Sequence, residues 1–135
     1  MFIDEYEQMA IDFLKATGTR LEITAKRNVN GTPKKSKMTG GNEYYCKLRR
    51  GHKTYSFTFN DSIHNRVEHI RPTKYDVLAC LETWDYLENF DDFMWEFGYD
   101  NDEHARSVYK ACMKQSEKLH GLFNDKEIEM LNDIC

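Results

Sequence analysis

The stretch EYYCKLRRGHKTYSFTFN, residues 43–60, holds two alternating runs of residues on either side of a short link that contains Gly51. Apolar side chains recur at every second position: Tyr44, Cys46 and Leu48 in the first run, and Tyr55, Phe57 and Phe59 in the second. Such alternation is typical of a strand with one buried face, and a short link with glycine is typical of a hairpin. We therefore predict two antiparallel strands, at 43–49 and 53–60.

The residues before this hairpin predict a helix and a third strand. Residues 3–17 carry apolar side chains at helical spacing, with Asp4 placed to cap the start and Gly18 to cap the end. Residues 19–27 alternate in the same way as the hairpin, with one side formed by Leu21, Ile23 and Ala25. We expect this first helix to pack on a three-stranded antiparallel β-meander.

The second half of the sequence predicts helices alone. Each expected helix follows a residue that commonly caps helices: Thr73, Asn89, Asp102, and Asn124 or Asp125. Strands followed by helices indicate an α+β fold rather than a wound parallel sheet. We predict one domain over 1–135, with the helix and meander in 1–60 and about four helices in 73–135. Its expected core is formed by Phe13, Leu21, Ile23, Phe57, Leu78, Leu81, Phe93, Phe97, Val108 and Cys112.

Composition limits the class of protein. The chain has 135 residues, of which 40% are hydrophobic and 31% charged, and no apolar run approaches the roughly 20 residues of a membrane span. The first residues are acidic and do not resemble a secretory signal, and the four cysteines are widely spaced. We expect a cytoplasmic protein with reduced thiols, the alternative being a secreted protein with two disulfides.

The sequence offers little for catalysis. It contains no phosphate-binding loop, no nucleophile elbow and no Cys-x-x-Cys, and its five histidines lack the usual metal-ligand spacing. His64 and His69 fall in one predicted loop, where exposed histidines are a simpler interpretation than a metal site. We predict a protein that is not an enzyme and needs no metal or cofactor.

Charge is distributed unevenly along the chain, although the net charge is only −4. Residues 18–60 contain ten Lys or Arg against two acids, whereas residues 76–103 contain ten Asp or Glu and no Lys or Arg. Such separation of charge indicates two candidate binding surfaces, one acidic and one basic.

The acidic surface is expected around Trp95, on the helix predicted from Asn89. This tryptophan falls opposite the helix's apolar stripe, and exposed tryptophan ringed by charge is typical of a protein-binding hot spot. The alternative is that Trp95 packs against another helix. The predicted surface consists of Asp85, Glu88, Asp91, Asp92, Trp95, Glu96, Asp100, Asp102 and Glu103.

The basic surface is expected on the hairpin and on the loop predicted at 28–42. Tyr45 falls on the same side of its strand as two basic residues, so it could stack on a base while the cations hold phosphates. The alternative is an ordinary solvated sheet face. The candidate residues are Lys26, Arg27, Lys34, Lys35, Lys37, Lys47, Arg49, Arg50 and Lys53.

Three stretches carry a family resemblance: IDEY continued by DFLKAT in residues 3–17, YDVLACL at 75–81, and FDDF with EFGYD in residues 90–100. Together they resemble small proteins carried by phages and prophages of gut-type Gram-positive bacteria. The resemblance spans most of the chain and transfers no active site. It implies a context in which small accessory proteins bind and block host defence proteins, as anti-CRISPR proteins do.

These observations lead to two functional hypotheses. The first is a non-enzymatic phage-type inhibitor that binds a host nuclease or nucleic-acid-binding complex through a charged surface in the host cytoplasm. The alternative is a small nucleic-acid-binding regulator that uses the basic hairpin. Neither hypothesis involves a membrane, and both allow a monomer or a small homo-oligomer.

Overall fold

The computed structural model describes residues 4–37, 41–60, 72–81, 83 and 89–134. The chain divides into two compact units, the first comprising Met1–Leu81 with Glu129–Cys135 and the second comprising Glu82–Ile128. The order of elements, one helix, three strands and then helices, confirms the predicted α+β class.

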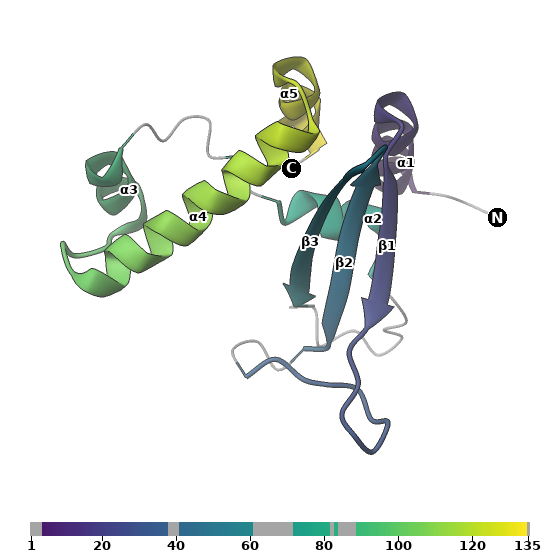
Figure 1. The fold of residues 1–135 in the computed structure, drawn as a ribbon, viewed down its shortest axis with the longest axis horizontal. Helices are drawn as coiled ribbons and strands as arrows, with labels where there is room; N and C mark the ends of the chain where they lie inside the picture. Colours follow the sequence, from purple (N-terminus) through teal and green to yellow (C-terminus); the bar gives the residue numbers. More distant parts are fainter. Residues whose placement is uncertain (1–3, 38–40, 61–71, 82, 84–88, 135) are drawn as a thin grey trace. The chain divides into compact units, whose positions relative to one another are not determined.

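The first unit contains the predicted meander. Strands β1 (Arg20–Ala25), β2 (Glu43–Arg50) and β3 (Lys53–Asn60) form an antiparallel sheet in the order β1-β2-β3 (Figure 1). Gly51 joins β2 to β3 with a φ of 60°, a left-handed conformation that glycine adopts without strain. β1 is shorter than the predicted range of 19–27, and beyond its end Arg27 pairs with Pro33 in an isolated bridge.

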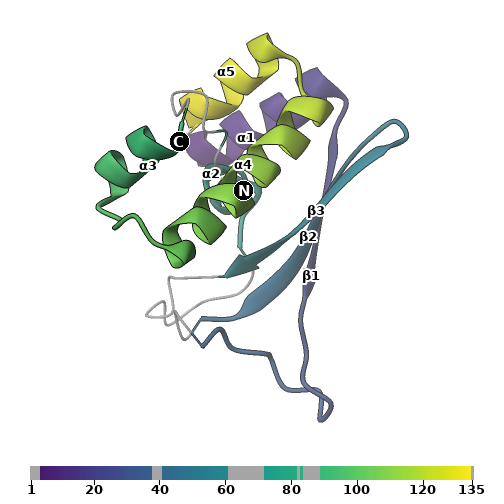
Figure 2. The ribbon, with the colours of Figure 1, turned by 60° about the vertical axis from the view of Figure 1, so that its left-hand side comes forward.

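One face of this sheet is covered by helices. Tyr44 and Cys46 are buried together with Val77 of α2 (Lys74–Ala79). Residues on the same side of β1 and β3, including Ile23 and Phe57, pack against them in the register Ile23↔Cys46↔Phe57. Figure 2 shows α1 (Glu5–Thr17) and α2 on this side, and Figure 1 shows the strands from the opposite side. No helix in the described part of the first unit covers that opposite side, which we call the uncovered face.

Hydrogen bonds join α1 to α2 within the first unit. Asp4 caps α1 by accepting a 2.7 Å hydrogen bond from the Tyr6 backbone amide, and Gly18 ends it in the left-handed conformation. The Glu7 carboxylate accepts hydrogen bonds from the backbone amides of Lys74 at 3.3 Å and Tyr75 at 3.0 Å. α2 therefore has two caps at its N-terminus, one local, from Thr73, and one from α1.

The second unit is built on Phe93 of α3 (Phe90–Phe97), which is 1% exposed. The Phe93 ring stacks on Tyr99 with 5.1 Å between centroids, and Tyr109 of α4 (Glu103–Leu122) lies 5.3 Å away. Val108 and Cys112 of α4 add to the same cluster. Asn89 and Asp102 cap these two helices, as the sequence predicts.

The last helix, α5 (Asp125–Ile134), follows Asn124, which exchanges 2.9 Å hydrogen bonds with Glu127 in a capping box. Ile128, Leu131 and Ile134 are buried, as their helical spacing predicts. The residues from Glu129 onward belong to the first unit.

Of the ten predicted core residues, four are buried, five are partly buried and one is exposed. Phe13, Leu78, Leu81 and Phe93 are buried, whereas the predicted core residues that are only partly buried are Leu21, Ile23, Phe57, Val108 and Cys112. Phe97, the last residue of α3, is 44% exposed, although its ring centroid lies 5.4 Å from that of Phe93. His64 and His69, the two histidines of the loop predicted after the hairpin, lie outside the described residues.

Candidate functional site

The acidic candidate surface lies on α3, a helix whose two ends are fixed by local chemistry. The Asn89 side chain accepts a 2.9 Å hydrogen bond from the Asp92 backbone amide, and Gly98 ends the helix with a φ of 69°. Asp91 and Asp92 occupy the first turn, where the partial positive charge of the helix N-terminus favours carboxylates. Part of this acidity therefore has a structural reason.

The structure of the helix does not account for Trp95 in the same way. It is 86% exposed, the most exposed aromatic residue among the large hydrophobic side chains of the described chain. Asp91 precedes it by four residues and Asp92 by three, so both carboxylates lie one turn away on the same side of the helix. The alternative that Trp95 packs against another helix is therefore not what the structure shows.

Glu96 completes this group on the exposed side of α3. It follows Asp92 by four residues, a spacing at which like charges repel one another weakly. Asp91, Asp92, Trp95 and Glu96 are all exposed, while Phe93 on the opposite side anchors the helix. We call these four exposed residues the α3 surface.

The remaining acidic candidates do not all belong to this group. Asp100, Asp102 and Glu103 are exposed at the turn between α3 and α4. Asp102 has a structural task, because its side chain accepts a 2.8 Å hydrogen bond from the Ala105 backbone amide and caps α4. Asp85 and Glu88 lie outside the described residues.

The basic candidates fall into three places on the first unit. Lys26, Lys47 and Arg49 lie on the uncovered face of the sheet, and Arg50 and Lys53 flank the turn between β2 and β3. The other four follow β1 in a segment that leaves the sheet: Arg27, Lys34, Lys35 and Lys37.

Hydrogen bonds hold this segment in place. The Lys34 amide donates to the Lys26 carbonyl, and the Glu43 amide donates to the Lys34 carbonyl, both at 3.0 Å. Asn28 adds side-chain hydrogen bonds to the Pro33 carbonyl at 3.4 Å and to the Thr32 hydroxyl at 3.1 Å. The segment is thus attached to the beginning of β2 by backbone hydrogen bonds.

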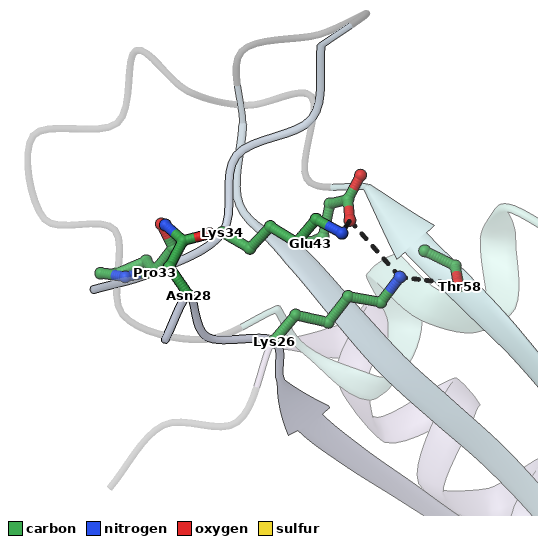
Figure 3. A network of polar contacts seen from close by, with 6 residues as sticks. All are labelled: Lys26, Asn28, Pro33, Lys34, Glu43 and Thr58. Carbon is green, nitrogen blue, oxygen red and sulfur yellow. Dashed lines mark hydrogen bonds and ion pairs between the residues drawn. The ribbon is translucent and has the colours of Figure 1, made fainter. Parts of the chain in front are cut away.

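A polar network links the segment to the uncovered face (Figure 3). The Lys26 ammonium lies 3.4 Å from the Glu43 carboxylate and donates a 3.2 Å hydrogen bond to the Thr58 hydroxyl. Lys34 approaches the same carboxylate at 3.9 Å. The Glu43 carboxylate, at the beginning of the central strand, therefore holds two lysines.

The uncovered face contains a shallow hollow of about 520 Å³ across all three strands. Its lining comes mainly from the polar side of the strands: Glu22, Thr24, Tyr45, Lys47, Ser56 and Thr58, with Cys46 and Phe57 between them. Tyr45 is 61% exposed, and the Lys26 ammonium lies 4.4 Å from the centroid of its ring. This cation–π contact orients the ring from one side.

The acids of this face are paired with cations. Arg49 donates a 2.9 Å hydrogen bond to the Glu22 carboxylate and lowers the pKa of Glu22, and the charges of Lys47 and Arg20 act in the same direction. Glu43 is shared by Lys26 and Lys34.

The alternation of residues predicts that Tyr45, Lys47 and Arg49 lie on one side of β2, and the register confirms this arrangement. The predicted basic surface does not include Glu22, Thr24, Ser56 or Thr58, which also line the hollow. Their alternation with the apolar positions was the available signal, because it puts them beside Tyr45 and Lys47 once the strands are paired.

Other chemistry is limited among the residues that the structure describes. They contain no group of three His, Cys, Asp or Glu side chains placed to hold a metal ion. Burial raises the pKa of the Cys46 thiol to about 11, and burial together with the neighbouring Cys80 raises the pKa of Tyr55 to about 12. Within the same residues, no helix has the length and hydrophobicity needed to cross a membrane.

Comparisons with protein-family models, with curated proteins and with solved structures found no match to this chain.

Proposed function

We propose that this protein is a non-enzymatic binding protein that uses the α3 surface to occupy a basic surface of a protein partner. The observation that supports this proposal is the 86% exposure of Trp95 on a helix that carries three exposed carboxylates. Tryptophan is enriched at the energetic centres of protein interfaces, where it enters a pocket and loses its water. The carboxylates would surround that anchor and steer it toward positive charge.

The construction of α3 supports the same role. Phe93 is buried beneath the helix, and Asn89 and Gly98 fix its ends. A helix held in this way presents its exposed side chains without needing to reorganise, which reduces the entropic cost of binding. Glu96 lies in the last turn of the helix, where a carboxylate is unfavourable, and four residues after Asp92, where like charges repel, so a binding role accounts for Glu96 better than a structural one.

The proposed partner is a host defence nuclease or another nucleic-acid-binding complex, bound in the cytoplasm of a bacterial host. The resemblance to phage-carried proteins supports this context. A channel that binds nucleic acid is lined by lysine and arginine, so an acidic helix with a protruding tryptophan is complementary to it in charge. On this proposal the protein acts as an inhibitor of the anti-CRISPR type, by covering the channel.

Binding variants test the proposal without disturbing the helix. Asp91→Asn with Asp92→Asn removes two charges but avoids placing lysines at the helix N-terminus, where they would oppose the helix dipole. Glu96→Lys can be used directly, because a cation near the C-terminal end of a helix is favourable. The matched control is Glu117→Lys, at an exposed position of α4 in the same unit.

We expect Glu96→Lys to slow association with the partner and Trp95→Ala to speed dissociation, each weakening binding at least about tenfold. Glu117→Lys should leave binding unchanged. Surface plasmon resonance against the partner isolated from host cells separates the two rates. Unaltered rates for Trp95→Ala, Glu96→Lys and the double Asn variant would show that this surface does not bind the partner.

A further inference from the structure

We propose that the uncovered face of the sheet is a second binding site, and that it binds single-stranded nucleic acid with one unpaired base stacked on Tyr45. This site lies in the first unit, whereas the α3 surface lies in the second, and the two share no residue. The inference therefore goes beyond the proposed function and does not depend on it.

Tyr45 has the properties of a stacking platform. It lies on the central strand of the sheet, pairs with Thr24 on one side and Thr58 on the other, and is 61% exposed. The Lys26 ammonium, 4.4 Å from its ring centroid, is itself held by Glu43 and Thr58. The ring is thus oriented before any ligand arrives, which lowers the cost of stacking a base on its exposed side.

The charge of the face fits a phosphodiester chain. Its cations are Arg20, Lys26, Lys47 and Arg49, against the two carboxylates of Glu22 and Glu43. Arg49 holds Glu22 in an ion pair at 2.9 Å, and two lysines share Glu43, so both negative charges are compensated locally. Lys47 follows Tyr45 by two residues on the same face, where it can meet a phosphate next to a stacked base.

The hollow also suits a nucleotide in size and polarity. Its volume of about 520 Å³ falls within the range of small-molecule sites in proteins. The hydroxyls of Thr24, Ser56 and Thr58 border it, and each can donate or accept a hydrogen bond. They can pair with the edge of a base or with a sugar while the ring of Tyr45 covers the base's flat side.

Single strands are the expected ligand because duplexes keep their bases stacked inside the helix. Only an unpaired base can lie flat on a side chain that stands on a sheet. An acidic peptide would satisfy the cations of the face but would have no need of the tyrosine ring. Dependence on the ring therefore distinguishes nucleic acid from an acidic protein.

The test measures binding of the full chain to a fluorescein-labelled oligothymidylate of about 12 nucleotides by fluorescence anisotropy. The same label on a duplex of equal length provides the comparison, and salt is varied from about 50 to about 200 mM. We expect the single strand to bind more tightly than the duplex. Tyr45→Ala should weaken binding by about fivefold or more, whereas Tyr45→Phe, which keeps the ring, should bind like the wild type.

Lys47→Gln should weaken binding and make the slope of log K against log salt shallower by about 0.7, the value for one phosphate of a single strand. Lys110→Gln, at an exposed position of α4, is the matched control and should change neither quantity. Circular dichroism of each variant confirms that the sheet is intact.

Three outcomes would overturn the inference. The first is no binding of the single strand at the lowest salt concentration. The second is equal binding of single strand and duplex with no effect of Tyr45→Ala. The third is displacement of the oligonucleotide by polyglutamate at the same concentration, which would assign the face to an acidic protein instead.

Discussion

Two phenylalanines of α3 differ in how far their side chains are exposed to solvent. Phe93 is 1% exposed and Phe97, one turn later, is 44% exposed. Phe93→Ala should lower the free energy of unfolding by about 3 to 5 kcal/mol, because it removes buried surface and leaves a cavity. Phe97→Ala should cost less than about 1.5 kcal/mol, since much of its ring is already in water.

Urea denaturation of the two variants, followed by circular dichroism, compares these losses directly. The two substitutions delete the same atoms from one helix, so each serves as the control for the other. Equal losses would mean that Phe97 is buried to the same degree as Phe93 in solution.

The thiols are expected to differ in the same way. Cys46 is buried, and its raised pKa of about 11 leaves almost no thiolate near neutral pH, whereas Cys80 is exposed. Since the thiolate is the reactive form, N-ethylmaleimide at pH 7.5 should modify Cys80 long before Cys46. Mass spectrometry of digests taken over time measures both rates. Rapid labelling of Cys46 without denaturant would contradict its burial.

A raised pKa also makes stability depend on pH. The folded protein holds the Cys46 proton more tightly than the unfolded chain, whose thiol has a pKa near 9. The unfolded state therefore loses its proton first as the pH rises, and stability falls between about pH 9 and pH 11. Cys46→Ala should make this alkaline loss shallower while lowering stability at neutral pH, as thermal unfolding at a series of pH values would show.

Among the elements, the second cap on α2 is the feature that local sequence did not reveal. Glu7 of α1 accepts hydrogen bonds from two backbone amides at the start of α2, about 67 residues further along the chain. Glu7→Ala should therefore destabilise the protein by about 1 to 3 kcal/mol, because the amides lose a charged acceptor. Glu5→Ala, in the same first turn of α1, is the matched control and should cost no more than about 1 kcal/mol.

The elements themselves were predictable because their signals are local. Asp4, Thr73, Asn89 and Asp102 each cap the helix that the sequence assigns to them. The alternation in residues 43–60 gives both the strands and the sides of the sheet, because side chains on a strand alternate by geometry. These choices need no knowledge of distant contacts.

Features that depend on which elements pack against one another could not be predicted from the sequence. The exposure of Trp95 was open in the sequence, because an aromatic side chain opposite one apolar stripe can still find a second helix. The hollow around Tyr45 requires three strands in register, because Glu22, Thr24, Ser56 and Thr58 line it from the strands on either side. The pairing of Glu22 with Arg49 likewise joins residues 27 positions apart.

At the scale of the whole molecule, the modest net charge of −4 conceals two surfaces of opposite sign on different units. The α3 surface is negative, and the uncovered sheet face carries two more cations than carboxylates. Oppositely charged surfaces allow one small protein to attract a basic protein and a nucleic acid at separate sites.

The stability of the whole chain should not depend on metal or on disulfides. Among the described residues there is no cluster of metal-binding side chains, and Cys46, Cys80 and Cys112 form no disulfide bond. EDTA and dithiothreitol, added separately, should therefore each shift the melting temperature by less than about 2 °C, an effect below about 1 kcal/mol. A drop of many degrees with either reagent would reveal a bond or a ligand that stabilises the fold.

A photo-crosslinking amino acid placed at position 95 reveals whether the α3 surface contacts a protein partner. Benzoylphenylalanine is aromatic and can replace Trp95 without touching the core, because this side chain is 86% exposed. The matched control carries it at position 117 of α4. We expect a discrete crosslinked complex in host cells from position 95, absent from position 117 and lost when Glu96→Lys is added. Indistinguishable crosslinking patterns at the two positions would show that the α3 surface does not bind a protein partner.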